Sequence, residues 1–365
     1  MSLATFSDYK KLITDKIPLI DVRAPIEFEK GAFETSVNLP LMNNKERELV
    51  GIRYKNNGNE AAIELGYKLV SGEIKEQRVK AWLDFINKNP NAIIYCFRGG
   101  QRSQIAQKWL LEAGIEIARI EGGYKAFRGY LIEQLDSMQN SITPIRLGGT
   151  TGSGKTIVLK KLENSIDLEA LANHRGSAFG NHITPQPTQI NFENNLAFEI
   201  IKKLELGKRV QIFEDEGRNI GRVYMPKKIY EYINSSDLVV LETPLEKRVE
   251  ITFNEYVVEA QNEYKIFFNK SFLQEWAKSI LGNLEKIHKR LGDKLYKEIK
   301  ELFLNALKEQ ELHNNLELHK VWIEHLLTIY YDPMYEYQLS KKSNIVFRGN
   351  EAEVIEYLQS RSKLS

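Results

Sequence analysis

Short apolar runs alternate with helical stretches along the first third of the chain. The short runs are rich in Ile, Leu and Val, as expected for buried strands, and fall at residues 17–23, 36–40, 92–95 and 117–120. Helices are predicted between and after them, at residues 60–70, 73–88, 103–112 and 127–135. Because strands that alternate with helices build parallel sheets, residues 1–135 are predicted to form one complete α/β domain.

The rest of the chain divides into four segments. Residues 136–142 are polar and turn-prone, which predicts a linker. Alternating strands and helices predict a second parallel α/β domain over residues 143–252, followed by a helical segment over residues 253–340. Residues 341–365 regain a strand and a helix and are predicted to return to that second domain. The helical segment therefore interrupts or caps it.

One helix with a basic face is predicted within the helical segment. Leu284, Ile287, Leu291, Leu295 and Leu302 recur at helical spacing, with lysines and arginines between them. A solvated face and an RNA-contacting face both fit this pattern.

Composition limits the class of protein. The chain has 365 residues, of which 42% are hydrophobic and 27% charged, values ordinary for a soluble globular protein. Its single cysteine excludes an internal disulfide framework and favours a reducing compartment. No apolar run reaches membrane-spanning length, so we expect a cytoplasmic protein without a membrane partner. With a net charge of only +2, a nucleic-acid site must be a local patch.

The cysteine lies in a turn between a predicted strand and a predicted helix. Cys96 is a candidate catalytic residue, and it precedes a candidate anion-binding loop made of Arg98, Gly99, Gly100, Gln101, Arg102 and Ser103. Backbone N–H groups, the positive end of a helix and two arginines would stabilise a thiolate and attract an anion. A lone cysteine can also be a small buried apolar residue, which is the alternative here.

A second glycine-rich turn begins the second domain. After a strand at residues 145–147, and before apolar residues at helical spacing, the pattern of a P-loop is complete at Gly149, Thr150, Thr151, Gly152, Ser153, Gly154, Lys155 and Thr156. Its glycines allow backbone N–H groups to surround phosphate oxygens, and Lys155 supplies a positive charge. Thr156, together with Asp215 after the strand at residues 210–213, is a candidate ligand for Mg²⁺.

Polar loops add candidate substrate contacts. Residues 168–180 and 186–194 contain histidine, arginine and glycine, which is typical of functional loops, although a long surface loop has the same composition. Arginines at strand ends suit phosphate clamps. The candidates are His174, Arg175, Arg218, Arg222 and Arg248.

Three motifs in the first domain resemble those of rhodanese domains. They are residues 19–23, the cysteine loop, and residues 121–127 with the sequence Glu-Gly-Gly-Tyr-Lys-Ala-Phe. The resemblance implies that Cys96 carries sulfur or selenium. Five residues separate Cys96 from Arg102, a spacing that resembles the longer loop of rhodanese-fold phosphatases. We therefore expect the loop to accept a phosphate-like oxyanion such as selenophosphate.

The whole chain is similar to the bacterial tRNA 2-selenouridine synthase family. Besides the rhodanese-like domain and the P-loop NTPase-like domain, the similarity rests on motifs at residues 173–177, 186–189, 192–194 and 214–221. Gly217 departs from the serine expected in the last of these motifs.

The resemblance implies a selenotransferase and geranyltransferase that acts on wobble 2-thiouridine in the anticodon region of tRNA. Geranyl diphosphate would alkylate the sulfur at the P-loop, and selenophosphate would then replace the S-geranyl group at the Cys96 loop. The resemblance implies no tightly bound cofactor, although Mg²⁺ remains a candidate. A selenophosphate supply enzyme is a candidate partner. The oligomeric state and a covalent selenium intermediate on Cys96 stay open.

Three other functions also fit the residues. A P-loop kinase with a regulatory rhodanese module would turn over ATP and need Lys155 but not Cys96. A simple sulfurtransferase would turn over thiosulfate or a persulfide without tRNA. A non-catalytic RNA-binding adaptor would tolerate substitution of both residues.

Overall fold

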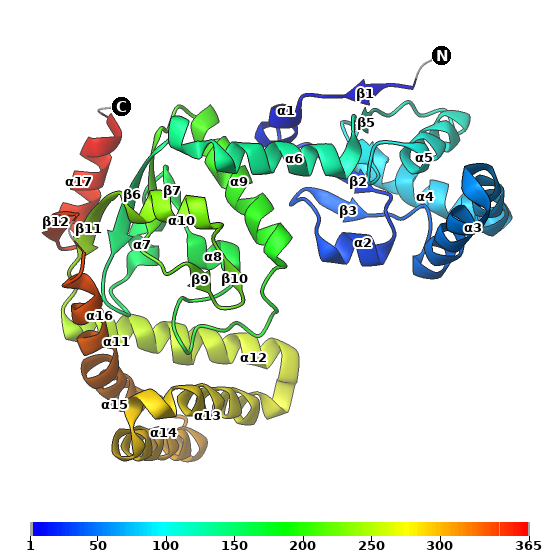
Figure 1. The fold of residues 1–365 in the computed structure, drawn as a ribbon. Helices are drawn as coiled ribbons and strands as arrows, with labels where there is room; N and C mark the ends of the chain where they lie inside the picture. The colour runs from blue at the N-terminus through cyan, green and yellow to red at the C-terminus, as the bar shows by residue number, and fades with distance from the viewer. Residues whose placement is uncertain (1–2, 343, 364–365) are drawn as a thin grey trace. The chain divides into compact units, whose positions relative to one another are not determined.

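The computed structural model describes residues 3–342 and 344–363. The chain forms two compact units (Figure 1). The first contains Met1–Met138 and Thr188–Leu206, and the second contains Gln139–Pro187 and Gly207–Ser365. Both are parallel α/β structures, which confirms the predicted fold class.

The first unit is built on a five-stranded parallel sheet in the order β1-β5-β4-β2-β3. Its strands are β1 (Thr5–Phe6), β2 (Leu19–Asp21), β3 (Ser36–Asn38), β4 (Ile93–Tyr95) and β5 (Arg119–Ile120). Its helices are α1 (Tyr9–Thr14), α2 (Pro25–Lys30), α3 (Asn44–Leu69), α4 (Gly72–Lys88), α5 (Gln101–Glu112), α6 (Gly123–Asp136) and α9 (Gln189–Glu205). The central strands β2 and β4 are fully buried, as their apolar runs predict.

Helix α3 is a hairpin of two arms rather than one rod. Gly58 interrupts it with φ 81° and ψ −176°, a conformation that favours glycine. A Cβ atom on Gly66 would lie 3.9 Å from Val50 Cγ2, although these residues would be about 24 Å apart along a straight helix. The arm before Gly58 is almost wholly exposed and carries no apolar stripe, so the sequence pattern does not predict it. Its one sequence signal is the capping box between Asn43 and Glu46.

Helix α9 belongs to the first unit, although its residues lie within the range 143–252 that we expect from sequence to form the P-loop domain. The side chains of Asn191 and Asn194 hydrogen-bond the backbone N–H and C=O of Ala32, at 2.8 Å each. Arg128 of α6 pairs with Glu193 and donates to Asn194. The motif at residues 192–194 therefore attaches this helix to α6 and to the loop before β3 of the first unit.

The second unit contains a five-stranded parallel sheet in the order β12-β11-β6-β8-β7. Its strands are β6 (Thr143–Gly148), β7 (Ser165–Ile166), β8 (Val210–Glu214), β11 (Asp237–Leu241) and β12 (Ile345–Gly349), while β9 (Asn219–Ile220) and β10 (Val223–Tyr224) form a small antiparallel pair. Helices α7 (Lys155–Lys160), α8 (Leu168–Ala172), α10 (Lys227–Asn234) and α17 (Glu351–Lys363) belong to this unit. The 3₁₀-helical turn Met138–Asn140 precedes β6.

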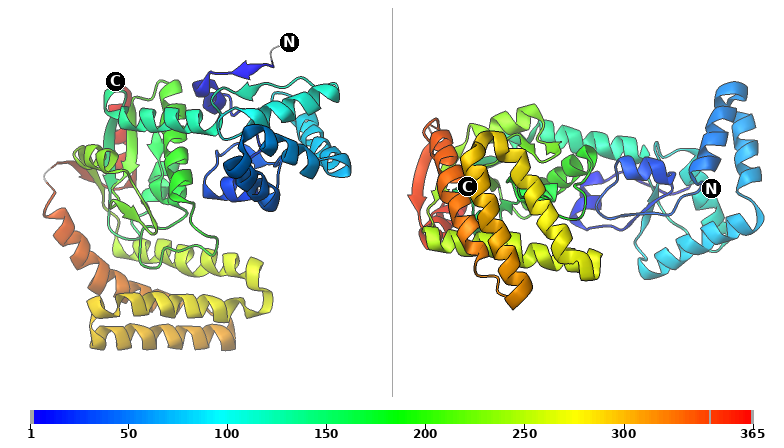
Figure 2. Two further views of the ribbon diagram at one scale, coloured as in Figure 1. Left: turned by 45° about the vertical axis from the view of Figure 1, so that its right-hand side comes forward. Right: turned by 90° about the horizontal axis from the view of Figure 1, so that it is seen from below.

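A helical layer follows β11 and ends before β12 (Figure 2). It consists of α11 (Leu245–Phe253), the π-helical turn Asn254–Glu259, α12 (Ala260–Phe268), the 3₁₀ turn Asn269–Ser271, α13 (Phe272–Leu291), α14 (Asp293–His313), α15 (His319–His325), the π-helical turn Leu326–Tyr331 and α16 (Asp332–Leu339). The single basic helix predicted over residues 284–304 is wrong, because Gly292, at φ 77°, separates α13 from α14.

The helical layer has its own core, centred on Trp276, Phe303 and Trp322. His319 lies inside it, where Nδ1 accepts a hydrogen bond from Trp322 Nε1 at 3.0 Å and Nε2 lies 2.9 Å from Gln310 Oε1. Burial lowers the pKa of His319 to about 4, so the imidazole is neutral near pH 7. Within the described residues, no helix is both long and apolar enough to cross a membrane.

Candidate functional site

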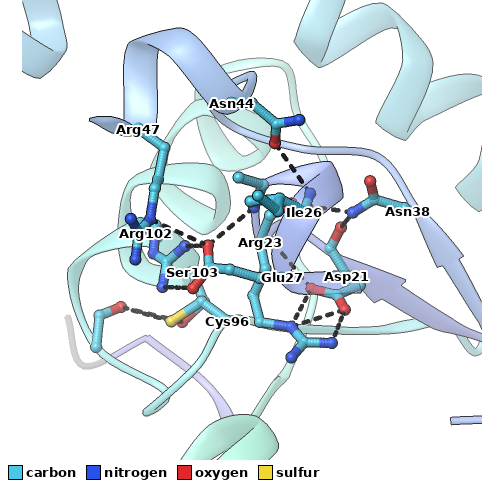
Figure 3. A network of polar contacts seen from close by, with 12 residues as sticks. Asp21, Arg23, Ile26, Glu27, Asn38, Asn44, Arg47, Cys96, Arg102 and Ser103 are labelled. Carbon is cyan, nitrogen blue, oxygen red and sulfur yellow. Dashed lines mark hydrogen bonds and ion pairs between the residues drawn. The ribbon is translucent and has the colours of Figure 1, made fainter. Parts of the chain in front are cut away.

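The Cys96 loop connects β4 to the N-terminus of α5. The side chain of Cys96 is 3% exposed, and its Sγ lies 3.2 Å from Ser103 Oγ and 3.8 Å from the Gly100 carbonyl oxygen (Figure 3). Ser103 Oγ also donates to Gly100 O at 3.0 Å. These bonds bring the beginning and the end of the predicted anion loop together around the sulfur atom.

Two glycines allow the turn at residues 121–124 to lie against the Cys96 loop. Tyr124 N–H donates to the Cys96 carbonyl at 2.9 Å. A Cβ on Gly123 would lie 2.3 Å from both Cys96 O and Gly99 N, and Gly123 has φ 62°. Gly99 has φ 63°, and a Cβ on it would lie 2.8 Å from the Ile120 carbonyl oxygen. The Glu-Gly-Gly-Tyr motif therefore shapes the back of the cysteine loop.

A buried ion pair supports the neighbouring strand end. Arg23 and Asp21 are 2% and 0% exposed, and Arg23 Nη2 donates to Asp21 Oδ2 at 2.6 Å. Arg23 Nη2 also donates to the Gly31 carbonyl, and its guanidinium lies 3.9 Å from the centre of the Tyr124 ring. Asp21, the last residue of β2, and Arg23 therefore form a buried structural pair beside the cysteine loop.

Arg102 is held by a carboxylate that sequence reasoning did not single out. Its Nη1 and Nη2 donate to Glu27 of α2 at 2.6 and 3.2 Å (Figure 3). Burial tends to raise the pKa of Glu27, but Arg102 and Arg47 outweigh it and lower that pKa below its usual value. Arg98, by contrast, is exposed. An incoming anion would thus meet one arginine held by a carboxylate and one exposed arginine.

A pocket of about 790 Å³ opens beside Cys96 in the first unit. Both arms of α3 line it, together with the Cys96 loop and α5. Most of its wall is apolar, whereas Arg47, Arg98 and Arg102 supply positive charge. The first arm of α3 was absent from the predicted helices, so the pocket could not be derived from the sequence pattern.

The P-loop of the second unit follows β6 and begins α7. Gly152 has φ 76°, and a Cβ there would lie 2.8 Å from the Arg248 carbonyl oxygen, so this position requires glycine. A Cβ on Gly149 would lie 3.0 Å from the Leu241 carbonyl oxygen, which leaves little room. Lys155 Nζ donates to the Gly149 carbonyl at 3.4 Å. The segment Gly149–Thr156 therefore has the strand, turn and helix arrangement in which P-loops bind phosphate.

Three glutamates surround Lys155: Glu169, Glu214 and Glu216. Burial alone would lower the pKa of Lys155, but these carboxylates raise it above its usual value. Burial raises the pKa of Glu169 to about 8, assisted by Glu216 and opposed by Lys155. Burial likewise raises the pKa values of Glu214 and Glu216. The carboxyl groups therefore tend to share protons near neutral pH.

Asp215, the candidate metal ligand, already has two cationic partners. Its side chain is 4% exposed, Arg146 Nη1 donates to Oδ1 at 2.9 Å, and Lys342 pairs with Oδ2. The adjacent Glu214 differs, because its Oε1 is buried without a hydrogen-bond partner. Within the described chain, no three His, Cys, Asp or Glu side chains could hold a metal ion by themselves.

Arg248 lies behind the P-loop. It is 6% exposed, its Nε donates to Thr151 O at 3.1 Å, and it forms a two-pronged pair with Asp332 at 2.5 and 3.0 Å. In this arrangement it holds the P-loop backbone at Thr151 in place.

The candidate residues in the polar loops of the second unit differ in burial and in their partners. His174 is buried, and its Nδ1 accepts from Gly176 N–H at 3.1 Å. Burial, with help from His182 and Arg175, lowers the pKa of His174. Arg175 pairs with Glu263 of α12 at 2.8 Å. Arg218 and Arg222 are both exposed, the first directly before β9 and the second in the turn between β9 and β10.

Two family models together match most of the chain. The family described as "tRNA 2-selenouridine synthase AAA domain" matches residues 142–365, and "Rhodanese-like domain" matches residues 5–130. A solved N-terminal domain of a putative ATP/GTP binding protein from Clostridium difficile 630 is 32% identical over 35% of this chain and 99% of its own, but its TM-score of 0.31 is too low to support the fold.

Curated relatives match along nearly the full length. The tRNA 2-selenouridine synthase of Sulfurovum sp. (strain NBC37-1) is 55% identical over 97% of both chains. Those of Shewanella sediminis and Hydrogenovibrio crunogenus are 48% and 47% identical, and each match covers at least 97% of both chains. The family match spans more than half of the chain and agrees with these relatives. This chain therefore belongs to the tRNA 2-selenouridine synthase family.

Proposed function

We propose that this enzyme converts the wobble 2-thiouridine of tRNA to 2-selenouridine through an S-geranyl intermediate, using geranyl diphosphate and selenophosphate. The observation that carries the proposal is the pair of glycine-rich anion loops, each at the carboxyl end of a central parallel strand. One has a P-loop lysine, and the other has a cysteine beside an apolar pocket.

The first step belongs to the P-loop. The sulfur of 2-thiouridine attacks C1 of geranyl diphosphate, the C–O bond breaks, diphosphate leaves and the uridine N3 proton is released. Lys155 and the backbone N–H groups of Gly149–Thr156 would stabilise the negative charge that develops on the leaving diphosphate. Arg248 holds the backbone at Thr151 in place for this task.

Mg²⁺ would fit this site as a companion of the diphosphate. Thr156 and the partnerless carboxylate oxygen of Glu214 are the residues that would hold it, whereas Asp215 is occupied by Arg146 and Lys342. When bound, the ion would neutralise phosphate charge and the surrounding carboxylates. We expect it to need phosphate oxygens to complete its ligands.

The second step belongs to the Cys96 loop. Selenium of selenophosphate attacks C2 of the S-geranyl base, the C–S bond breaks, and the geranyl thiolate leaves and takes up a proton. Water then cleaves the Se–P bond and releases phosphate. Selenium needs no change of oxidation state on this route. We therefore assign Cys96 to contact the selenium as a soft ligand, while Arg98 and Arg102 bind the phosphate group.

Selenation and geranylation can be separated by mass analysis of tRNA incubated with both donors. We expect Cys96→Ser to lower selenation about 100-fold while geranylated tRNA still forms, because the donor is misplaced. Lys155→Ala should lower geranylation about 100–1000-fold but still convert supplied S-geranyl RNA. The reverse pattern would exchange the two sites.

Two controls separate the alternatives. The intact mass of the enzyme after exposure to selenophosphate alone should not increase by one selenium atom, whereas such an adduct would establish a covalent role of Cys96. Turnover of ATP or thiosulfate without any change in tRNA would instead indicate a kinase or a simple sulfurtransferase.

We also propose that the substrate binds through the anticodon region of tRNA. Arg218 and Arg222 are candidate phosphate contacts, since both are exposed and belong to the second unit. Neutralising them together should weaken tRNA binding and make it less sensitive to salt, measured by filter binding across salt concentrations. An unchanged salt dependence would place the RNA contact elsewhere.

A further inference from the structure

The pocket beside Cys96 is much larger and more apolar than an oxyanion requires. Its volume of about 790 Å³ lies within the range of small-molecule sites. Val50, Ile63, Tyr67, Ile105 and Trp109 contribute to its wall. Tyr67 is 44% exposed, and Ile52, which also lines the pocket, is 52% exposed. Exposed apolar side chains concentrated beside a reactive loop indicate an apolar ligand.

Chemistry links this wall to the cysteine loop. In the second step of the proposed function, C2 of the base is bonded to the departing sulfur, and that sulfur is bonded to the first carbon of the geranyl chain. The chain must therefore lie two bonds from the carbon that selenium attacks. If selenophosphate is held at Cys96, the prenyl chain has to extend from the immediate neighbourhood of Cys96.

The pocket of the first unit meets this requirement. Cys96 and Arg102 lie on the same pocket wall as the apolar residues of α3 and α5, and all of them belong to the first unit. The charged part of the rim suits the phosphate of the donor, and the apolar part suits a hydrocarbon chain. A polar base alone would leave the apolar wall in contact with water.

We propose that the pocket formed by the α3 hairpin, α5 and the Cys96 loop holds the geranyl chain of S-geranyl-2-thiouridine during selenation, and so selects the prenylated base. This inference rests on the proposed function. The α3 hairpin, which the break at Gly58 folds back on itself, is then a specificity element of the selenation step.

The test compares two synthetic anticodon-loop RNAs, one carrying S-geranyl-2-thiouridine and the other S-methyl-2-thiouridine, each supplied with selenophosphate. The wild-type enzyme should convert the geranyl RNA with a kcat/KM at least about 100-fold higher than the methyl RNA. Ile63→Glu places a charge in the apolar wall and should lower this ratio at least about tenfold by raising KM for the geranyl RNA alone.

A second variant adds an aromatic side chain at the pocket lining. Gly51 lines the pocket, and a Cβ there would meet nothing within 4 Å, so Gly51→Phe has room to fold and should also lower the ratio. The matched control is Ile132→Glu on α6, where Ile132 is 41% exposed and lies outside the pocket lining. It should leave the ratio unchanged. The methyl RNA is measured in parallel because a general loss of folding would lower the conversion of both RNAs equally.

The outcomes are distinguishable. Failure of the wild-type enzyme to convert the geranyl RNA would overturn the proposed function. Conversion with a ratio near one, or a ratio that both pocket variants leave unchanged, would overturn only the assignment of the pocket. Equal loss for both RNAs, with folding intact, would assign the pocket to the base. Loss of geranylation with full conversion of supplied geranyl RNA would assign it to the first step.

Discussion

The Cys96 loop and the P-loop have the same strand, turn and helix arrangement, but the charged side chains around them have opposite signs. Each follows a central parallel strand, contains glycines that leave no room for a Cβ, and begins a helix. Arg47, Arg98 and Arg102 line the pocket beside Cys96, whereas three glutamates surround Lys155.

The difference indicates what each loop needs from its ligand. At the Cys96 loop, Glu27 compensates only part of the charge of Arg47, Arg98 and Arg102, so the loop could attract an anion by itself. The pocket beside it has an apolar wall for the rest of a ligand. The P-loop lysine is already compensated by carboxylates, so an anionic ligand at this loop would have to arrive with protons or a cation. Backbone shape alone thus defines an anion loop, while the neighbouring side chains decide which anion enters and in what charge state.

The largest effect should come from the ion pair beside the cysteine loop. Asp21→Asn leaves the buried Arg23 without its counter-charge, which should destabilise the first unit by about 3–5 kcal/mol in denaturant unfolding. The control Asp237→Asn removes a pair with Arg361 at 3.4 Å in which both side chains are more than 40% exposed. It should cost at most about 1 kcal/mol. Similar losses in both variants would contradict the assigned importance of burial.

Next in size is the effect of Gly123→Ala. The new Cβ would meet Cys96 O and Gly99 N at 2.3 Å in a left-handed backbone conformation, so the cysteine loop must move. We expect a destabilisation of about 2–4 kcal/mol and a loss of selenation of about 100-fold. Gly129→Ala on the same helix has open space and should be neutral or stabilising by up to about 1 kcal/mol. Normal selenation by Gly123→Ala would show that the close approach is unimportant.

A smaller effect concerns the carboxylates around the P-loop. The pKa of Glu169 is raised from 4.5 to about 8, so the folded state binds more protons than the unfolded state between these values. Stability that is present at low pH should therefore be lost as pH rises from about 5 to 8. Glu169→Gln should reduce this slope in thermal unfolding, while Glu163→Gln, at a site that is 81% exposed, should not. A steeper slope in Glu169→Gln would contradict the assignment.

The smallest effect should come from releasing Arg102. Glu27→Gln weakens the two-pronged pair and leaves more positive charge for an anion, so inhibition of selenation by inorganic phosphate should become about threefold tighter. Glu112→Gln, which removes an exposed partner of Lys75, is the control. The inhibition constant for phosphate at low salt is the measurement. Weaker inhibition would mean that Glu27 orients Arg102 for phosphate rather than competing with it.

Some candidate residues could be found from the sequence because each motif occupies consecutive positions along the chain. Cys96 and its loop occupy eight consecutive positions, and the P-loop another eight, so strand, turn and helix signals surround each motif directly. The parallel α/β class followed from the same alternation. By contrast, the single helix predicted over residues 284–304 was wrong, since apolar spacing continues past Gly292 while the backbone does not.

The sequence by itself determined the two glycine-rich loops between a strand and a helix, because glycine conformations and the signals of the flanking elements are local properties. Only the tertiary structure decided their surroundings. Glu27 reaches Arg102 from 75 residues away, and Asp332 reaches Arg248 from 84 residues away. The apolar pocket needs both arms of α3 against α5. Glu169, which follows β7, meets Lys155 and Glu214 only once β8 lies between β6 and β7. Charge pairing and cavities depend on distances in space, which spacing along the chain does not encode.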